Sequence, residues 1–384
     1  MKKNLLLAAM AAAAMTSCSN DDVIEVNQGD KIAFQASMEK LLTRATVESS
    51  DDMGIFNVTA IGNGTNYFTD LTVTKGGTGW DPAITYYWPS YALNFYAYAP
   101  VKATDKTPDF TGTVQIANGA KQIVGFSPEQ TVSDQKDLLI SCNNGQKLAS
   151  VPMNFKHALS QIEVKAKKAD ENVKIEVIGV KLVNLGTKAN FTFPEAKTEK
   201  GYNLTKAACW SDPSEKDQPA KAYMVKGSTA KELGTTAESI MFGTDNFMVI
   251  PQKMNPWGGT AAKTGAYLSV LCRISVKNGA NLTQIYPQPA AGATTTDTYA
   301  FSAVPITPDW EPGKKYTYTL TFCDKASNAG AGKIDPNPET PDGTDSSNVE
   351  TTPGTGGTPI LGDAIKFTVT VDTWTAGTDQ SANM

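Results

Sequence analysis

Histidine is almost absent from this sequence, because His157 is the only one among 384 residues. A single imidazole argues against a Ser-His-Asp triad and against a Cys-His pair with a spare base. It also argues against a metal site built from several histidines, unless oxygen or sulfur atoms supply the ligands. His157 lies in the stretch Phe-Lys-His-Ala-Leu at the expected start of a strand. We therefore expect this side chain to have a structural role.

Nucleotide-binding motifs are also missing. The chain has no P-loop, and no Gly-x-Gly-x-x-Gly stretch follows an expected strand. With 39 acidic residues, a pair of carboxylates placed for glycoside hydrolysis stays open as an alternative. A group of aromatic residues can in principle stack on sugar rings, although we expect these side chains mainly to pack between sheets. They are Tyr86, Tyr87, Trp88, Tyr91, Tyr96 and Tyr98. We expect no cofactor, no metal and no catalysis.

The sequence lacks a basic patch and a long apolar run. Lys and Arg number 34 against 39 Asp and Glu; removing residues 1–17, which include Lys2 and Lys3, leaves 32 against 39, a net charge of −7. Nucleic acid is therefore not an expected partner. The apolar run 5–15 is too short to cross a bilayer, which takes about 20 residues.

Cysteine is sparse and widely spaced, with no Cys-x-x-Cys pair. Apart from Cys18, the chain contains Cys142, Cys209, Cys272 and Cys323. In an oxidising compartment these four can form two disulfides with any of three connectivities, and the sequence leaves their redox state open. Cys272 shares one strand face with the apolar side chains of residues 268–276, so a buried free thiol is expected there.

The first residues have the pattern of an export signal. Lys2 and Lys3 precede the apolar run, and Met-Thr-Ser-Cys follows it, ending at Cys18. Small residues before a cysteine after such a run resemble the lipobox of bacterial lipoproteins. The resemblance implies cleavage before Cys18 and acylation of its thiol. The acidic run 19–22 resembles the tag that directs some lipoproteins to the outer face of the outer membrane.

The pattern of the rest of the chain predicts two sets of β-strands. Apolar residues alternate with polar ones in short runs bounded by Gly, Pro and Asn, and no credible amphipathic helix interrupts them. The clearest runs are 56–60, 67–74, 85–88, 93–99, 114–116, 122–126, 138–141, 162–166, 173–182, 191–193, 247–250, 267–276 and 316–322. A slip in the alternation beside Gly179 predicts a bulge. We divide the chain into a signal (1–17), an anchor segment (18–45), an N-terminal sandwich (46–150) and a C-terminal sandwich (151–384).

Both ends of the mature chain carry one strand with a regular alternation. Near the N-terminus, one face holds Ile32, Phe34, Ala36 and Met38. Near the C-terminus, one face of strand 365–374 holds Ile365, Phe367, Val369 and Val371. Residues 324–363, before this last strand, are rich in Pro, Gly, Thr, Asp and Asn, so we expect a flexible segment that forms no core.

Several stretches in this order resemble fimbrillin-family proteins, the subunits of type V pili. They are the lipoprotein signal, Ile32–Phe34, Thr43-Arg44-Ala45, residues 87–98, residues 155–160, residues 313–318 and Ile365–Trp374. The resemblance implies two tandem transthyretin-like β-sandwiches and export as a lipoprotein. It also implies cleavage between Arg44 and Ala45 by an Arg-specific protease, which removes the N-terminal strand. Subunits then polymerise by donor-strand exchange into a fimbrium on the cell outer membrane.

The prediction is therefore a non-enzymatic pilus subunit or accessory protein that supports cell adhesion. Its expected partners are other pilus subunits, the outer membrane through lipid on Cys18, and a host or bacterial surface ligand. We take the Ile32–Met38 strand as removable and the Ile365–Val371 strand as the donor. The alternative is a glycan-binding surface lipoprotein that stays anchored and monomeric, and a hydrolase ranks third. The sequence leaves open the position in the pilus (shaft, tip or anchor) and the adhesion ligand.

Overall fold

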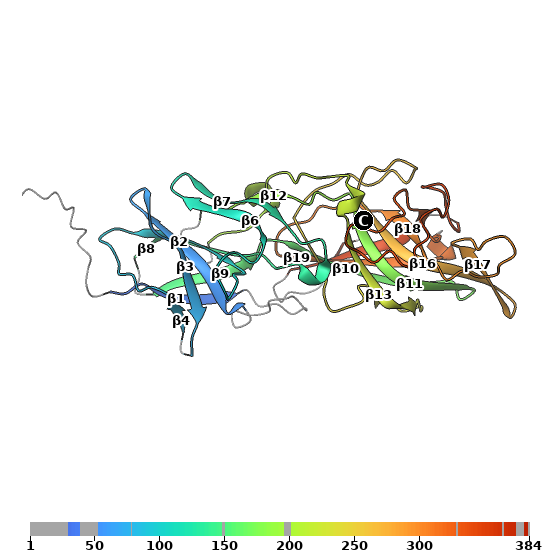
Figure 1. Ribbon diagram of the computed structural model, residues 1–384, viewed down its shortest axis with the longest axis horizontal. Helices are drawn as coiled ribbons and strands as arrows, with labels where there is room; N and C mark the ends of the chain where they lie inside the picture. The colour runs from blue at the N-terminus through green and yellow to red at the C-terminus, as the bar shows by residue number, and fades with distance from the viewer. Residues whose placement is uncertain are drawn as a thin grey trace, which may run out of the picture.

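The computed structural model describes residues 30–38, 53–77, 79–147, 150–195, 201–327, 329–362, 365–373 and 380–382. In this part of the chain the molecule is elongated, and its β-sheets follow one another along the long axis (Figure 1). Helical segments are single turns, namely α2 (Lys206–Cys209), η1 (Val132–Asp134), η2 (Pro219–Lys221) and η3 (Lys325–Ser327). No described helix is long and apolar enough to cross a membrane. The expected all-β class is confirmed.

The N-terminal strands form a closed ring in which the neighbours follow the order β1-β4-β3-β2-β5-β8-β9. These strands are β1 (Ala33–Met38), β2 (Ile55–Gly62), β3 (Thr65–Lys75), β4 (Trp80–Pro82), β5 (Leu93–Ala99), β8 (Leu139–Gln146) and β9 (Ser150–His157). The ring closes where β1 pairs in parallel with β9, from Ala33 opposite Ser150 to Met38 opposite Phe155. The sequence predicted a β-sandwich in this half, and the structure has a closed barrel instead. The closure is not visible in the alternation, because the two paired strands lie far apart in the sequence.

A second layer covers one side of this barrel. It consists of β6 (Thr111–Ala117), β7 (Ala120–Ser127) and β12 (Ala189–Thr192), in the order β12-β7-β6. Tyr96 and Tyr98 of β5 point towards this layer and share a core cluster with Phe126, Phe191 and Trp210. Strand β5 is therefore buried on both faces. Since β12 follows β11 in sequence, the later part of the chain contributes directly to the N-terminal unit.

The C-terminal half is a sandwich of two sheets. One has the order β14-β10-β19-β21-β22 with β15 also on β10, and the other has the order β13-β11-β16-β18-β20 with β17 also on β16. The first sheet contains β10 (Ser160–Lys168), β14 (Glu238–Ser239), β15 (Phe247–Val249), β19 (Lys314–Phe322), β21 (Lys366–Thr373) and β22 (Gln380–Ala382). The second contains β11 (Val173–Val183), β13 (Tyr223–Glu232), β16 (Tyr267–Asn278), β17 (Asn281–Tyr286), β18 (Ala300–Pro305) and β20 (Lys333–Ile334).

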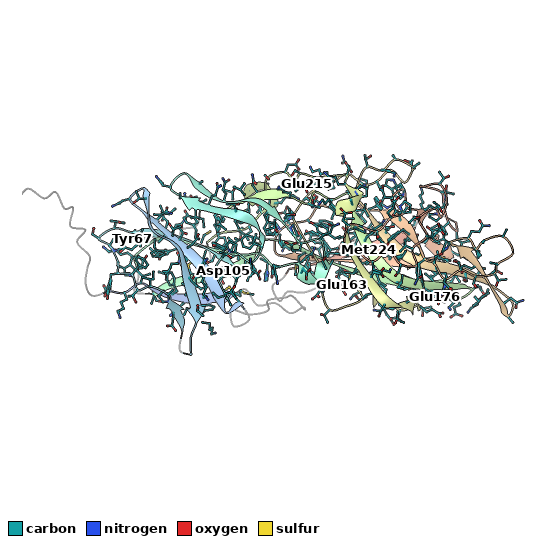
Figure 2. All side chains as sticks on the ribbon, viewed as in Figure 1. Tyr67, Asp105, Glu163, Glu176, Glu215 and Met224 are labelled. Atoms are coloured by element: carbon teal, nitrogen blue, oxygen red, sulfur yellow. The ribbon has the colours of Figure 1, made fainter. Side chains whose placement is uncertain are left out.

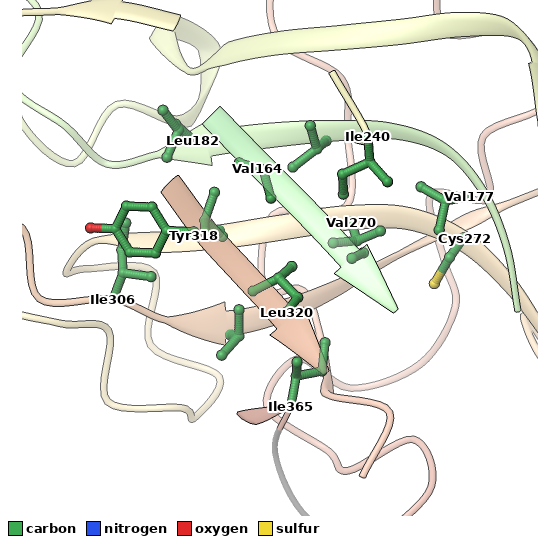
Figure 3. Packing of buried hydrophobic residues seen from close by; sticks show 14 of the residues in the cluster. Val164, Val177, Leu182, Ile240, Val270, Cys272, Ile306, Tyr318, Leu320 and Ile365 are labelled. Atoms are coloured by element: carbon green, nitrogen blue, oxygen red, sulfur yellow. The ribbon is translucent and has the colours of Figure 1, made fainter. Parts of the chain in front are cut away.

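Apolar side chains from both sheets fill the space between them (Figure 3). Val164 of β10 and Leu320 of β19 come from one sheet, while Leu182 of β11 and Val270 of β16 come from the other, and all four are fully buried. Residues that alternate along each strand therefore share one core, as expected for stacked sheets about 10 Å apart.

The predicted bulge in β11 is confirmed. Pairing of β11 with both β13 and β16 shifts register between Val177 and Gly179. A Cβ atom at Gly179 would lie 2.9 Å from the backbone oxygen of Val225, closer than carbon and oxygen normally approach. Glycine therefore allows β13 to approach at the bulge.

The prediction that residues 324–363 contribute to no core was wrong. Ala331 is fully buried, Ile334 is 8% exposed and Asp335 is 1% exposed. Strand β20 pairs with β18 of the sandwich, and the backbone N–H of Ile334 donates to the oxygen of Thr358 at 2.9 Å. The composition of this segment does not predict the packing. The packing depends on a few apolar and charged side chains that contact residues distant in the sequence.

Candidate functional site: the two terminal strands

Strand β1 lies between two neighbours in the barrel wall. On one side it pairs in parallel with β9, and on the other Phe34 pairs with Trp80 of β4. Just before β1, the chain bonds to the segment that follows β4: the Ile32 N–H donates to the backbone oxygen of Tyr86 at 2.8 Å. The Trp88 N–H donates to the oxygen of Asp30 at 3.0 Å. The backbone of this short segment therefore bonds on both edges.

The predicted inward face of β1 is confirmed, but its four side chains are buried to different extents. Ile32 is 2% exposed and Phe34 is 3% exposed, whereas Ala36 and Met38 are only partly buried. The Phe34 ring meets the rings of Phe56 and Phe95 edge to face, with centroids 6.2 Å and 5.9 Å away. Burial of the first two side chains contributes about 3–6 kcal/mol before entropic costs.

Strand β9 provides the surface that β1 covers. Its side chains Val151, Met153 and Phe155 are fully buried in the same barrel core as Phe34. Ser37 adds a side-chain contact, since its hydroxyl donates to Asn154 Oδ1 at 3.1 Å. Removal of β1 would leave an apolar groove bordered by the unpaired backbone of β9, which is the geometry that accepts an added strand.

Strand β21 completes the first sheet of the sandwich. It pairs antiparallel with β19, from Lys314 opposite Thr373 to Thr321 opposite Lys366, and β22 pairs along its other side. Ile365 is 2% exposed and Val369 is 8% exposed, while Phe367 and Val371 pack against the core and stay partly buried. The Phe367 and Tyr318 ring centroids lie 5.8 Å apart. The predicted inward face is confirmed here too.

The structure does not bring the two terminal strands together. Strand β1 belongs to the N-terminal barrel and β21 to a sheet of the C-terminal sandwich. Within one chain each strand therefore completes a different unit. The other predicted site residues, Cys18, Arg44 and Ala45, lie outside the described residues.

His157 lies at the end of β9 and is 4% exposed. Its Nδ1 atom lies 2.6 Å from Oδ2 of Asp137, a carboxylate whose residue is 1% exposed. This contact joins the end of β9 to the segment before β8, which agrees with the structural role expected for the histidine.

The described cysteines Cys142, Cys209, Cys272 and Cys323 are free and buried. Burial raises the pKa of the Cys142 and Cys272 thiols, so both remain uncharged. The expectation for Cys272 is confirmed. Among the described residues, no group of three or more His, Cys, Asp or Glu side chains is placed to hold a metal ion.

The aromatic residues of segment 86–98 serve packing, as expected. Trp88, Tyr96 and Tyr98 are at most 3% exposed, and Tyr86 and Tyr91 pack against the barrel core while remaining partly exposed. The Trp88 and Phe95 ring centroids lie 5.8 Å apart at a steep angle. Five of the six aromatic residues, all except Tyr87, therefore belong to or pack against the apolar cores.

A buried charged cluster, which sequence reasoning missed, holds segment 329–362 on the sandwich. Lys181 is 1% exposed, and its Nζ lies 3.1 Å from Oδ2 of Asp335. The same Nζ donates to the backbone oxygens of Asn337 and Glu339 at 2.5 Å and 2.9 Å. Tyr267 donates its hydroxyl proton to Asp335 Oδ1 at 2.7 Å. We name these residues the Lys181 clamp.

The clamp lies in an apolar setting. Nζ of Lys181 stands 3.7 Å from the centroid of the Phe301 ring. Burial lowers the pKa of Lys181, although the Asp335 carboxylate opposes the shift. The only sequence signal was Lys181 itself, a charged residue within the otherwise apolar stretch 177–183.

The fold and the two terminal strands define an elongated all-β protein in which β1 contributes to a barrel and β21 to a sandwich. A model of the family described as fimbrillin-like matches residues 43–336. The chain belongs to this fimbrillin-like family. No curated protein matches it.

Two of the solved bacterial structures that match this chain carry fimbrial descriptions. A fimbrial protein from Bacteroides vulgatus has 20% sequence identity and a TM-score of 0.50, and the match covers 76% of this chain and 94% of that one. A fimbrial assembly protein from Parabacteroides distasonis has 8% identity and a TM-score of 0.38, with 92% and 98% covered. The match to the Bacteroides vulgatus protein indicates a similar fold.

Proposed function

We propose that this protein is a structural subunit or accessory protein of a fimbrium, polymerised by donor-strand exchange and supporting cell adhesion without catalysis. The observation that carries the proposal is β1, a short strand at the start of the described chain that closes the barrel and seals it with Phe34. Membership of the fimbrillin-like family supports the same function. The barrel with its covering layer and the sandwich would then be the two transthyretin-like units.

Exchange requires a replacement strand with matching side chains. In our proposal, Ile365, Phe367, Val369 and Val371 of one subunit take the places of Ile32, Phe34, Ala36 and Met38 in the next. The donor would run parallel to β9, as β1 does. Val369 and Val371 would replace side chains that are only partly buried, so the larger valine at the Ala36 position has room towards solvent.

Export and maturation complete the proposal. The chain would reach the outer membrane as a lipoprotein acylated on Cys18, and cleavage between Arg44 and Ala45 would then release β1. Its destination would be the surface-exposed fimbrium, with other pilus subunits as its partners. Cys18, Arg44 and Ala45 lie outside the described residues, so biochemical experiments test this part of the proposal.

Replacing Arg44 tests the maturation step. Arg44→Ala should leave β1 in the barrel, so the folded subunit should accumulate uncut and polymers should be absent. N-terminal sequencing of surface protein should give Ala45 in the parent and a longer chain in the variant. Lys40→Ala changes a nearby basic residue and should mature normally. Normal polymers from Arg44→Ala would refute cleavage at Arg44 as the trigger.

Replacing Cys18 tests the anchor. Cys18→Ala removes the only thiol available for acylation at the end of the signal, so lipid labelling should disappear and the protein should leave the membrane fraction. Ser19→Ala, which keeps the thiol, should behave like the parent. The lipoprotein step is excluded if the parent takes up no lipid label and Cys18→Ala fractionates with membranes as the parent does.

A further inference from the structure

A small polar cavity of about 210 Å³ lies at the junction of the two units. Thr111 and Glu129 line it from the β6–β7 layer, while Thr187, Glu215, Lys221 and Tyr223 line it from the segments that lead to β12 and β13. Figure 2 shows Glu215 near the surface in this region. The volume is below the roughly 300–1,000 Å³ of cavities that hold drug-sized ligands, so an occupant must be small.

The two walls are joined by hydrogen bonds that keep the cavity in shape. The side-chain amide of Gln130 donates to the backbone oxygens of Ala220 and Ala222. The Thr187 N–H donates to the oxygen of Ser214 at 3.0 Å, which holds the loop that carries Glu215. The cavity is therefore a fixed feature of the junction.

Tyr223 provides the strongest sign of a ligand. The residue is 1% exposed, lines the cavity, and its hydroxyl has no hydrogen-bond partner among the described residues. A buried hydroxyl without a partner is costly, and native proteins normally satisfy such groups. Burial, together with Glu215 and Glu129, raises the pKa of Tyr223, so the hydroxyl keeps its proton and can donate it.

Two carboxylates provide acceptors beside this donor. Glu129 Oε1 accepts a hydrogen bond from the Thr111 hydroxyl at 2.7 Å, and Glu215 Oε2 accepts one from the Thr187 hydroxyl at 3.2 Å. Each threonine thus holds one carboxylate oxygen and leaves the other for a ligand. Lys221, an exposed residue, also lines the cavity and can supply a second donor.

This mixture of donors and acceptors selects among ligand classes. A simple cation would leave the Tyr223 proton without an acceptor, and an anion would meet two carboxylates against one lysine. Hydroxyl groups donate and accept together, so neighbouring hydroxyls on one ring can satisfy both kinds of group. We propose that the cavity binds a single neutral sugar ring through hydroxyls held by Tyr223, Glu129 and Glu215. This activity goes beyond assembly and does not depend on it.

Saturation-transfer NMR and calorimetry on the unpolymerised full chain carrying Cys18→Ala test the proposal. The probes are D-glucose, D-galactose, D-mannose, L-fucose and N-acetyl-D-glucosamine, with cadaverine as an ammonium probe. We expect at least one sugar to bind and cadaverine not to bind. The proposal is wrong if no sugar binds, or if only cadaverine does.

Tyr223→Phe removes only the hydroxyl and should weaken sugar binding about threefold to tenfold, the effect of one hydrogen bond. Its melting temperature without sugar should not fall, since the hydroxyl bonds none of the described residues. Tyr67→Phe is the matched control, because its hydroxyl bonds the Tyr87 oxygen at 2.7 Å in the distant barrel (Figure 2). It should bind sugar like the parent. Equal binding by Tyr223→Phe and the parent, or a lower melting temperature in Tyr223→Phe, overturns the assignment.

Discussion

Lys181→Met should reduce the free energy of unfolding by about 3–5 kcal/mol, the usual cost of breaking one side of a buried ion pair. The substitution leaves Asp335 buried without its cation and takes a donor from the oxygens of Asn337 and Glu339. Chemical denaturation measures the loss. Because the clamp holds segment 329–362, limited proteolysis should cut there first.

Lys174→Met is the matched control on the same strand. Lys174 is 28% exposed and pairs with Glu176 at 3.1 Å, so its loss should cost about 0–1 kcal/mol. The double variant Lys181→Met with Asp335→Leu removes both charges and should recover much of the stability lost by Lys181→Met alone. Equal losses from the two lysine variants would contradict the importance of the clamp.

Phe367→Asp should abolish polymer formation while the monomer still folds. In its own subunit Phe367 is partly buried beside Tyr318, so a carboxylate there can reach water. In the proposed exchange it would enter the place of Phe34, which is 3% exposed between Phe56 and Phe95. An unpaired buried charge costs several kcal/mol, and each 1.4 kcal/mol weakens association about tenfold.

Thr368→Asp is the control for this experiment, because Thr368 is exposed on the opposite face of the same strand. It should polymerise like the parent. Electron microscopy and size-exclusion chromatography report the polymers, and protease resistance reports the monomer fold. The donor assignment fails if Phe367→Asp polymerises normally, or if its monomer unfolds.

The sequence predicted strands best where one face is polar. The alternation in 162–166 and 365–371 matches β10 and the segment around β21, and Gly179 marked the bulge. Strands β13 and β17 were missed because their exposed residues show little apolar alternation. Residues 300–305 of β18 were missed because they are buried on both faces, which removes the alternation altogether.

For the functional sites, the sequence identified the faces of the terminal strands but not their partners. The parallel pairing of β1 with β9 and the contact between Lys181 and Asp335 join residues more than a hundred positions apart. Such contacts follow from topology, which local patterns do not encode. The sequence also did not predict a binding role for Tyr223. That role rests on a buried hydroxyl without a partner among the described residues, and no sequence motif marks it.

Strands β9 and β10 follow each other almost without interruption, since β9 ends at His157 and β10 begins at Ser160. Strand β1 runs parallel to β9, and β19 runs parallel to β10. These strands extend along the long axis of the molecule (Figure 1). A pulling force along that axis would load both ladders in shear, because their hydrogen bonds run across the strands. All bonds in a ladder would then share the load instead of opening one by one, so the subunit should resist stretching more strongly along this axis than across it.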